Sequence, residues 1–284
     1  MRRDIPSRIK RKIWTSVAGE ESWVNRHGDF RTRERYGLIF RPHYLYGMLR
    51  AADVAKYFGR QSVTVVEFGV ASGAGLLNMI SLAPAIEQET GVKLQIIGFD
   101  TGSGLPPIQG YKDHPEIWNP GDFATEDRDK LLDKVGGRAQ IIWGDISDTV
   151  DSFADSLDAS APLGFISIDV DIYTAAKAAL RCLTNKPEKY NPAVSMYFDD
   201  VSSFFATDWA GELAAIAEFN GDHALRKIGC DRSLPGHRPV KFASWYSKMY
   251  GCHILDHEAR QKPKARPELN IGNHFDYMAS QFLS

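Results

Sequence analysis

Residues 65–75 read VVEFGVASGAG, an apolar run that ends in an acid and continues into a glycine-rich turn. The pattern predicts a buried strand, a tight turn and then a helix whose N-terminus presents free backbone N–H groups. Glycines in such a turn let the backbone pass close to a ligand. The spacing is not GxGxxG, so the turn is a poor fit to the pyrophosphate of a dinucleotide. A glycine-rich turn that binds nothing is the alternative interpretation.

The sequence on either side repeats this alternation of apolar runs and helical periodicity. The runs are short and nearly continuous, which is typical of strands buried on both faces of a parallel sheet. They are found at 64–68, 94–99, 139–143, 165–168 and 194–198, and helical periodicity is found at 41–58, 76–86, 176–183 and 209–216. The sequence therefore predicts an α/β fold, a doubly wound, mostly parallel, Rossmann-like sheet with helices on both faces.

The alternation is confined to the middle of the 284 residues. We expect one domain over residues 40–261, an N-terminal extension over 1–39 that is rich in charge, and a C-terminal extension over 262–284 that contains two prolines and little periodicity. No linker divides the chain into two domains. The sequence leaves the oligomeric state open, with a homo-oligomer as one possibility.

The composition restricts the classes of partner. Hydrophobic residues make up 43% and charged residues 25%, and the formal net charge is -2, which argues against a general binder of nucleic acid or membrane surfaces. No apolar stretch approaches the roughly 18 residues of a membrane span, and the basic N-terminus lacks the apolar core of a signal peptide. Three cysteines without paired spacing fit a reducing compartment. We expect a cytoplasmic protein that acts on a small molecule.

Acids follow the second and third apolar runs. Asp100 ends the second run, and an acid at that place can accept hydrogen bonds from both hydroxyls of a ribose. Asp145 comes shortly after the third run. Each of the two can instead be the N-cap of the helix that follows it. An acid after each of the first three runs, at Glu67, Asp100 and Asp145, is harder to explain by capping alone.

Two pairs of acids follow the fourth and fifth runs. Asp169 and Asp171 come after one, and Asp199 and Asp200 come after the other. Carboxylates that are brought together repel one another, and their apolar sequence neighbours offer no counter-charge. Mg²⁺ takes oxygen ligands and would relieve the repulsion, and it could also activate a hydroxyl group. The alternative is that Asp171 and Asp200 cap helices and that a single Asp is catalytic.

The first turn is similar to motif I of class I S-adenosylmethionine methyltransferases, an acid followed by alternating glycines. Ala71 replaces the middle glycine of that motif. The resemblance implies that S-adenosylmethionine binds here, with Asp145 beside the edge of the adenine. The cofactor-binding residues that it implies are Glu67, Gly69, Ala71, Ser72, Gly73, Asp100 and Asp145.

Four motifs in order resemble the macrocin O-methyltransferase (TylF-type) family. They are VEFGV at 66–70, GFDTGSGLP at 98–106, the segment 168–178 that begins IDVDIY, and FDD at 198–200. The resemblance implies Mg²⁺-dependent methylation of a hydroxyl on a sugar or a sugar-bearing small molecule. It also implies that Asp169, Asp199 and Asp200 bind the metal and that Asp169 is the catalytic base.

Departures from that family concern the part that would bind the acceptor. The loop over residues 104–123 is long and rich in proline, and it is a candidate wall for the acceptor in which Tyr111 or Trp118 could stack on a ring. Two other functions stay open. One is a metal-dependent glycosyltransferase that uses Asp169-Val170-Asp171, although this leaves the glycines after Glu67 unexplained. The other is a methyltransferase-like subunit that binds a partner without catalysis.

Overall fold

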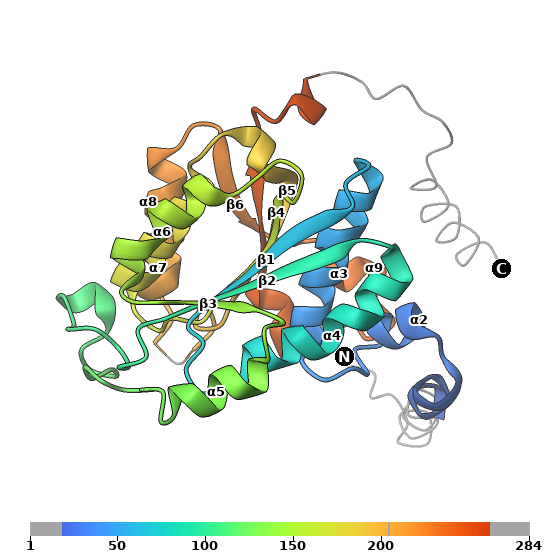
Figure 1. Cartoon of the computed structure of the whole chain (residues 1–284), viewed down its shortest axis with the longest axis horizontal. Coiled ribbons are helices and arrows are strands. Elements are labelled where there is room, and N and C mark those ends of the chain that lie inside the picture. The colour runs from blue at the N-terminus through green and yellow to red at the C-terminus, as the bar shows by residue number, and fades with distance from the viewer. Residues whose placement is uncertain (1–18, 204, 262–284) are drawn as a thin grey trace, which may run out of the picture.

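The computed structural model describes residues 19–203 and 205–261, and its strands form one sheet in the order β3-β2-β1-β4-β5-β7-β6 (Figure 1). Strands β1 to β5 are parallel to their neighbours among these five, whereas β7 is antiparallel to both β5 and β6. The strands are β1 (Ser62–Phe68), β2 (Lys93–Asp100), β3 (Gln140–Trp143), β4 (Leu163–Ile168), β5 (Tyr190–Phe198), β6 (Arg226–Cys230) and β7 (Met249–Ile254).

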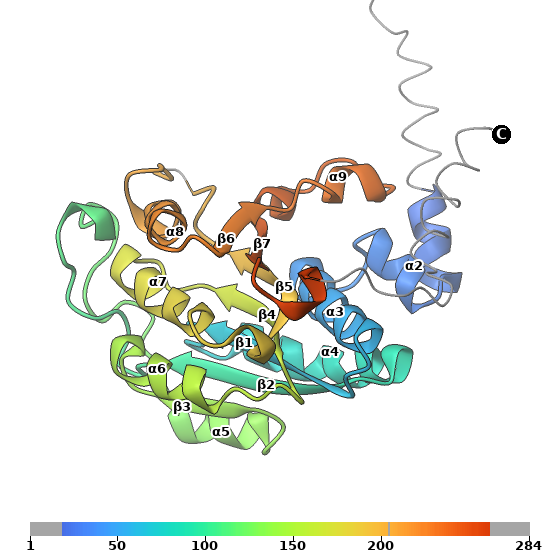
Figure 2. The ribbon, with the colours of Figure 1, turned by 90° about the horizontal axis from the view of Figure 1, so that it is seen from above.

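Helices cover both faces of the sheet, which confirms the predicted fold class (Figure 2). Helices α6, α7 and α8 lie on one face, and α3 and α4 lie on the other. The helices are α2 (Phe30–Arg35), α3 (Pro42–Tyr57), α4 (Ala74–Thr90), α5 (Arg128–Val135), α6 (Ile146–Ser156), α7 (Tyr173–Leu180), α8 (Gly211–Asp222) and α9 (Leu234–His237). The 3-10 turns are η1 (Tyr111–Asp113), η2 (Arg181–Leu183), η3 (Pro187–Lys189), η4 (Ser244–Lys248) and η5 (Glu258–Arg260).

Strand β1 shows why the apolar runs are continuous. Val63 and Val65 belong to the core under α3 and α4, whereas Val66 and Phe68 belong to the core under α6 and α7. Because successive side chains of a strand point to opposite faces, a strand covered on both sides needs apolar residues at nearly every position. The five predicted runs coincide with β1 to β5 for this reason.

Strands β6 and β7 were not predicted. β6 lies at the edge of the sheet, reads Arg-Lys-Ile-Gly-Cys and has two exposed residues at its end. β7 carries a glycine and an exposed His253. Neither strand has the continuous apolar pattern of the parallel strands, because neither is covered as completely by helices.

The first part of the predicted N-terminal extension, residues 1–18, and the whole predicted C-terminal extension, 262–284, lie outside the described residues. Within the described part, residues 19–27 are helical and α2 follows. Arg31 of α2 forms ion pairs with Asp53 of α3 and Glu89 of α4, and Glu34 of α2 forms one with Arg238. These ion pairs hold α2 against the domain. Over the described ranges, no helix has both the length and the apolar character for crossing a membrane.

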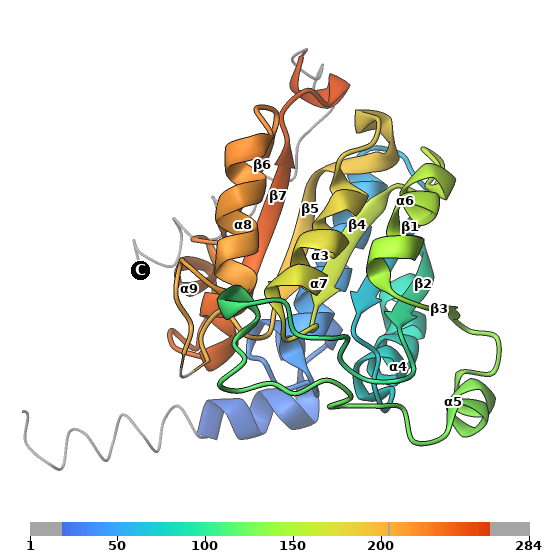
Figure 3. The ribbon, with the colours of Figure 1, turned by 90° about the vertical axis from the view of Figure 1, so that its left-hand side faces the viewer.

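The strand order reverses between β1 and β4, since the chain passes from β1 to β2 and β3 on one side and returns to β4 on the other. Ligands of open α/β sheets bind beyond the carboxyl ends of the strands at such a reversal. The segment between β2 and α5 crosses this end of the sheet (Figure 3). The fold thus places a long loop over the point where a ligand is expected.

Candidate active site

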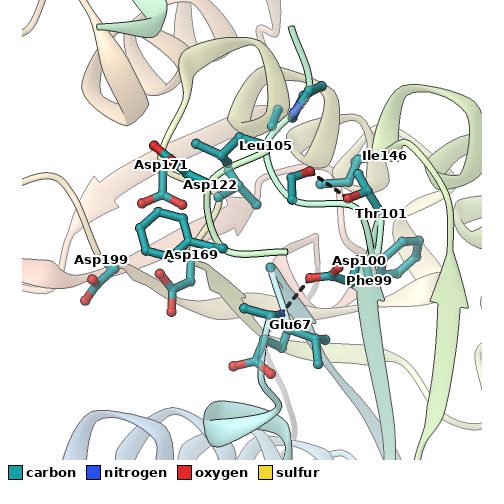
Figure 4. Close-up of a pocket in the computed structure, with 18 of the residues that line it drawn as sticks. Glu67, Phe99, Asp100, Thr101, Leu105, Asp122, Ile146, Asp169, Asp171 and Asp199 are labelled. Carbon is teal, nitrogen blue, oxygen red and sulfur yellow. Dashed lines mark hydrogen bonds between the residues drawn. The ribbon is translucent and has the colours of Figure 1, made fainter. Parts of the chain in front are cut away.

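A cavity of about 480 Å³ lies at the carboxyl ends of the parallel strands. One side of it is formed by the turn after β1 and the ends of β2 and β3, and the other by the acids after β4 and β5. Figure 4 shows Asp169, Asp171 and Asp199 on one side and Asp100, Thr101 and Ile146 on the other. The structure therefore brings the two predicted groups of residues into one cavity.

The backbone conformation of the turn after β1 and its close contacts explain why the turn contains glycines. Gly69 has φ +91°, and a Cβ atom there would lie 1.7 Å from the carbonyl oxygen of Asp169, so only glycine lets the turn pass beside β4. Ala71 has φ +46°, which is in the left-handed region. Both residues line the cavity, as does Ser72. Gly73 differs, because it does not line the cavity and a Cβ atom there would meet Leu131 of α5 at 2.3 Å.

Asp100 connects the end of β2 with this turn. Its Oδ2 accepts a hydrogen bond of 2.7 Å from the N–H of Ala71, drawn in Figure 4, and its Oδ1 accepts one of 2.5 Å from the N–H of Gly102. Oδ1 also lies 3.5 Å from the hydroxyl of Thr125, whereas Oδ2 keeps a second acceptor site, so the group can still accept from a ligand. Asp145 is the N-cap of α6 and accepts from the N–H of Ser147 at 2.7 Å, and it also lines the cavity. The capping interpretation is therefore correct for Asp145, without excluding a second role.

Glu67 is a buried acid at the bottom of the cavity, with only 1% of its surface exposed. The hydroxyl of Tyr44 donates to its Oε1 at 2.5 Å, while its Oε2 has no hydrogen-bond partner among the described residues. Burial, with the charge of Asp169 adding to it, raises the pKa of Glu67 to about 8. A Cβ atom on Gly75 would lie 1.7 Å from Oε1, which explains the glycine at that position.

Replacement of Glu67 by glutamine is expected to stabilise the protein in the absence of ligand. The pKa rises from 4.5 to about 8 on folding, so the folded protein binds the proton more tightly and the unfolding free energy falls as pH rises between these values. The glutamine side chain needs no proton, so the gain is about 3 kcal/mol at pH 7 and below about 1 kcal/mol at pH 5. Urea unfolding at the two pH values measures the difference. An equal effect of the substitution at both would show that Glu67 is ionised when folded.

Three of the four acids after β4 and β5 share one electrostatic trend. Burial and the neighbouring carboxylates raise the pKa of Asp169 to about 7, of Asp171 to about 8 and of Asp200 to about 6. Asp171 has φ +62°, and the N-cap of α7 is Ile172. The interpretation of Asp171 as a helix cap is therefore wrong. Its backbone takes a strained conformation while the residue lines the cavity.

Asp199 differs from the other three. The hydroxyl of Tyr197 donates to its Oδ1 at 2.5 Å, and the ammonium of Lys248 donates to the same oxygen at 3.0 Å. Burial alone would raise the pKa of Asp199, but these two contacts lower it. The expectation that the acids lack a counter-charge is wrong, because Lys248 supplies one. Lys248 stands 49 positions further along the chain, at the end of η4, where no sequence pattern links it to Asp199.

The predicted metal ligands Asp169, Asp199 and Asp200 all line the cavity. Within residues 19–203 and 205–261, however, no three His, Cys, Asp or Glu side chains form a group that could hold a metal ion as they stand. Asp199 pairs with Lys248, whereas Oδ2 of Asp200 is buried without a partner. The donor set has the chemistry of a Mg²⁺ site, although its side chains are not gathered around one point.

Glu212 is a buried acid behind the cavity that sequence reasoning missed; it contacts Asp200 without lining the cavity itself. It is buried in the first turn of α8, and its Oε2 accepts a hydrogen bond of 2.9 Å from the N–H of Asp200. Its Oε1 is buried and has no partner among the described residues. Burial, with the charge of Asp200 adding to it, raises the pKa of Glu212 well above its ordinary value. The sequence feature that could have indicated this residue is an acid in the otherwise apolar segment GELAAIA, residues 211–217.

The long loop after β2 forms the outer wall of the cavity. Trp118 lines the cavity and packs edge-on against Phe123, whereas Tyr111 is 71% exposed and does not line it. Asp113 fixes the loop to α7, since it accepts hydrogen bonds from the N–H and the hydroxyl of Thr174. The loop thus borders the cavity, with Trp118 rather than Tyr111 lining it, and its role toward an acceptor stays a prediction.

Comparisons with known proteins were made for the sequence and for the structure. No protein-family model and no curated protein sequence matches the chain. Among solved structures, the calicheamicin methyltransferase CalS11 is 20% identical, with a TM-score of 0.51 over 90% of this chain and 95% of that one. The chain has a methyltransferase fold. At this identity the likeness establishes the shared fold and no more.

Two further solved structures are similar with lower scores. The O-methyltransferase NovP is 16% identical over 67% of this chain and 77% of its own, with a TM-score of 0.48. An O-methyltransferase from Bacillus cereus in complex with SAH is 10% identical over 85% of this chain and 91% of its own, with a TM-score of 0.39.

Proposed function

We propose that the protein is an S-adenosylmethionine-dependent O-methyltransferase that acts on a hydroxyl of a sugar or a sugar-bearing small molecule. One observation carries the proposal: a single cavity joins the glycine-rich turn after β1 to the acids after β4 and β5. The turn suits a nucleoside donor, and the acids suit deprotonation of a hydroxyl group. The description of CalS11 as a calicheamicin methyltransferase supports methyl transfer as the reaction.

The donor would occupy the side of the cavity that Asp100 and Asp145 line. Asp100 would accept hydrogen bonds from the ribose hydroxyls, and Asp145 would lie at the edge of the adenine. Gly69, Ala71 and Ser72 would present their backbone to the sugar and the methionyl chain. Gly73, which we predicted to contact the cofactor, would act indirectly by letting α4 pack against Leu131 of α5.

The acceptor hydroxyl would lie between the donor and the acids. Asp169 is our choice for the base, because it lies between Glu67 and Asp199 in the cavity (Figure 4) and its pKa of about 7 suits removal of a proton from a hydroxyl group. Asp171 would accept a second hydrogen bond from the acceptor and orient it. The loop that carries Trp118 would exclude water from the reacting atoms. Proximity and a correctly placed base supply most of the rate in such a transfer.

We also propose that Mg²⁺ binds to Asp169, Asp199 and Asp200. The unpartnered Oδ2 of Asp200 supports this, as does the all-oxygen donor set. Lys248 would have to release Asp199 when the ion binds. The bound ion would lower the pKa of a coordinated hydroxyl.

Replacement of Asp100 by alanine is expected to weaken donor binding. Loss of charge-assisted hydrogen bonds to the ribose costs roughly 2–3 kcal/mol, which corresponds to an increase of about 30- to 150-fold in the dissociation constant. Calorimetric titration with S-adenosylhomocysteine measures the change. Asp100→Asn keeps the shape of the side chain and controls for its contacts with the turn. A change below about threefold in both variants would show that another group holds the ribose.

The activity is tested by transfer of an isotopically labelled methyl group from S-adenosylmethionine. Nucleotide-activated sugars and glycosides serve as acceptors, and mass spectrometry locates the label. Label on a sugar hydroxyl is the expected result. Label on a nitrogen or carbon atom, in a panel that includes amines and aromatic rings, would contradict the proposed acceptor class.

A further inference from the structure

Arg41 is a cation in the wall of the cavity that the function described so far leaves unused. It precedes α3 and has φ 50° and ψ 64°, a left-handed conformation that is unfavourable for residues other than glycine. Its Nε is buried without a hydrogen-bond partner, and in the described part of the chain no ion pair neutralises its guanidinium. Strained backbone of this kind persists where it serves to aim a side chain.

Tyr44 links Arg41 to the buried acid of the same cavity. The guanidinium carbon of Arg41 lies 5.5 Å from the centre of the Tyr44 ring, and the hydroxyl of that ring donates to Oε1 of Glu67. Ser167 in turn donates to the Tyr44 hydroxyl at 3.0 Å. The guanidinium of Arg41 therefore lies over the ring of Tyr44, and the carboxyl group of Glu67 lies at the hydroxyl of that ring. This arrangement places a guanidinium and a carboxyl group near each other without an ion pair between them in the described structure, and a cationic group of a ligand would favour the ionised form of that carboxyl.

A cation and an acid that share a cavity wall but do not pair can receive a ligand that carries both charges. Oε2 of Glu67 needs a donor, and Nε of Arg41 needs an acceptor. In Figure 4, Glu67 lies on the opposite side of Asp100 from Thr101 and Ile146, so it faces a different part of the ligand from the nucleoside. An α-amino acid presents an ammonium and a carboxylate one carbon apart, which matches the two unpartnered groups.

We propose that Arg41 binds the α-carboxylate of the methyl donor while Glu67 accepts from its ammonium, so that Arg41 makes the site specific for a donor with an intact amino-acid group. This inference rests on the proposed function. Arginine suits the role because its planar fork matches a carboxylate. Tyr44 and Ser167 position Glu67 and do not touch the donor.

The test compares S-adenosylmethionine with decarboxylated S-adenosylmethionine, which lacks only the carboxylate. Calorimetric titration of the full chain is expected to show that wild type prefers the intact donor by about 30-fold or more. Arg41→Met should weaken binding of the intact donor by about the same factor and change binding of the decarboxylated donor less than threefold. Arg41→Gly, which suits a positive φ, should behave in the same way.

Arg260→Met is the matched control, since Arg260 donates to the carbonyl oxygen of Pro192 near the start of β5, at the end of that strand opposite the cavity, and does not line the cavity. It should change binding of neither donor. A wild type that binds both donors equally, or an Arg41→Met variant that weakens both by one factor, would overturn the role of Arg41 and leave the proposed function intact. Failure of wild type to bind either donor would overturn both proposals.

Discussion

Asp169→Asn is expected to reduce methyl transfer by about 1000-fold or more, within the range that general-base catalysis contributes. The amide keeps the shape of the side chain but can neither take the proton of the acceptor hydroxyl nor carry the negative charge. Since Asp169 lies on the acidic side of the cavity, the affinity for S-adenosylhomocysteine should change less than threefold. Single-turnover rates with labelled S-adenosylmethionine, together with calorimetric titration, separate the two effects.

Asp171→Asn is the comparison that makes this prediction specific. Asp171 lines the same cavity and also has a raised pKa, but it is assigned to orienting the acceptor. Its replacement should raise the KM for the acceptor more than it lowers kcat. If Asp171→Asn lowers kcat further than Asp169→Asn does, the two residues have the opposite roles.

Removal of divalent metal with EDTA is expected to abolish methyl transfer without abolishing donor binding. The carboxylates of three aspartates would then be left beside the acceptor, and within residues 19–203 and 205–261 the one ion pair they form is that of Asp199 with Lys248. Mg²⁺ should restore the rate, and Zn²⁺ should restore it poorly because the ligand set contains oxygen alone. Asp199→Asn should reduce the response to Mg²⁺.

Turnover that is indifferent both to EDTA and to Asp199→Asn would contradict the metal site. Lys248 would then be the counter-charge of the cluster, as its ion pair with Asp199 suggests. Lys248→Met separates these outcomes further. It should leave a Mg²⁺-dependent enzyme active, because the ion replaces Lys248 at Asp199, whereas it should inactivate an enzyme that depends on the lysine.

The sheet was predictable because its five parallel strands are buried on both faces. Burial of this kind demands continuous apolar runs, and the chain contains them at the positions of β1 to β5. The acids after these runs were predictable for the same reason, since a strand that ends at the rim of a parallel sheet places its next residue at the ligand site. The position of Asp100 next to the turn after β1 follows from the pairing of β1 with β2.

Contacts between distant segments could not be predicted in this way. Lys248 reaches Asp199 from a turn before an antiparallel strand whose sequence has no clear period. Tyr44 reads as an ordinary core position of α3, yet its hydroxyl holds Glu67. Gly73 fits motif I in spacing, and a side chain there would also meet Leu131 of α5. Each of these roles depends on a contact between residues of segments that are distant in the sequence. The residue pattern of one segment does not show such a contact.

Binding of S-adenosylmethionine by the turn after β1 underlies the proposed reaction. Calorimetric titration of the wild-type chain with S-adenosylhomocysteine and, separately, with uridine diphosphate glucose tests it directly. We expect one molecule of S-adenosylhomocysteine to bind per chain, whether or not uridine diphosphate glucose also binds as an acceptor. Binding of uridine diphosphate glucose in the presence of Mg²⁺, without binding of S-adenosylhomocysteine, would contradict it and would favour a glycosyltransferase that uses Asp169 and Asp171.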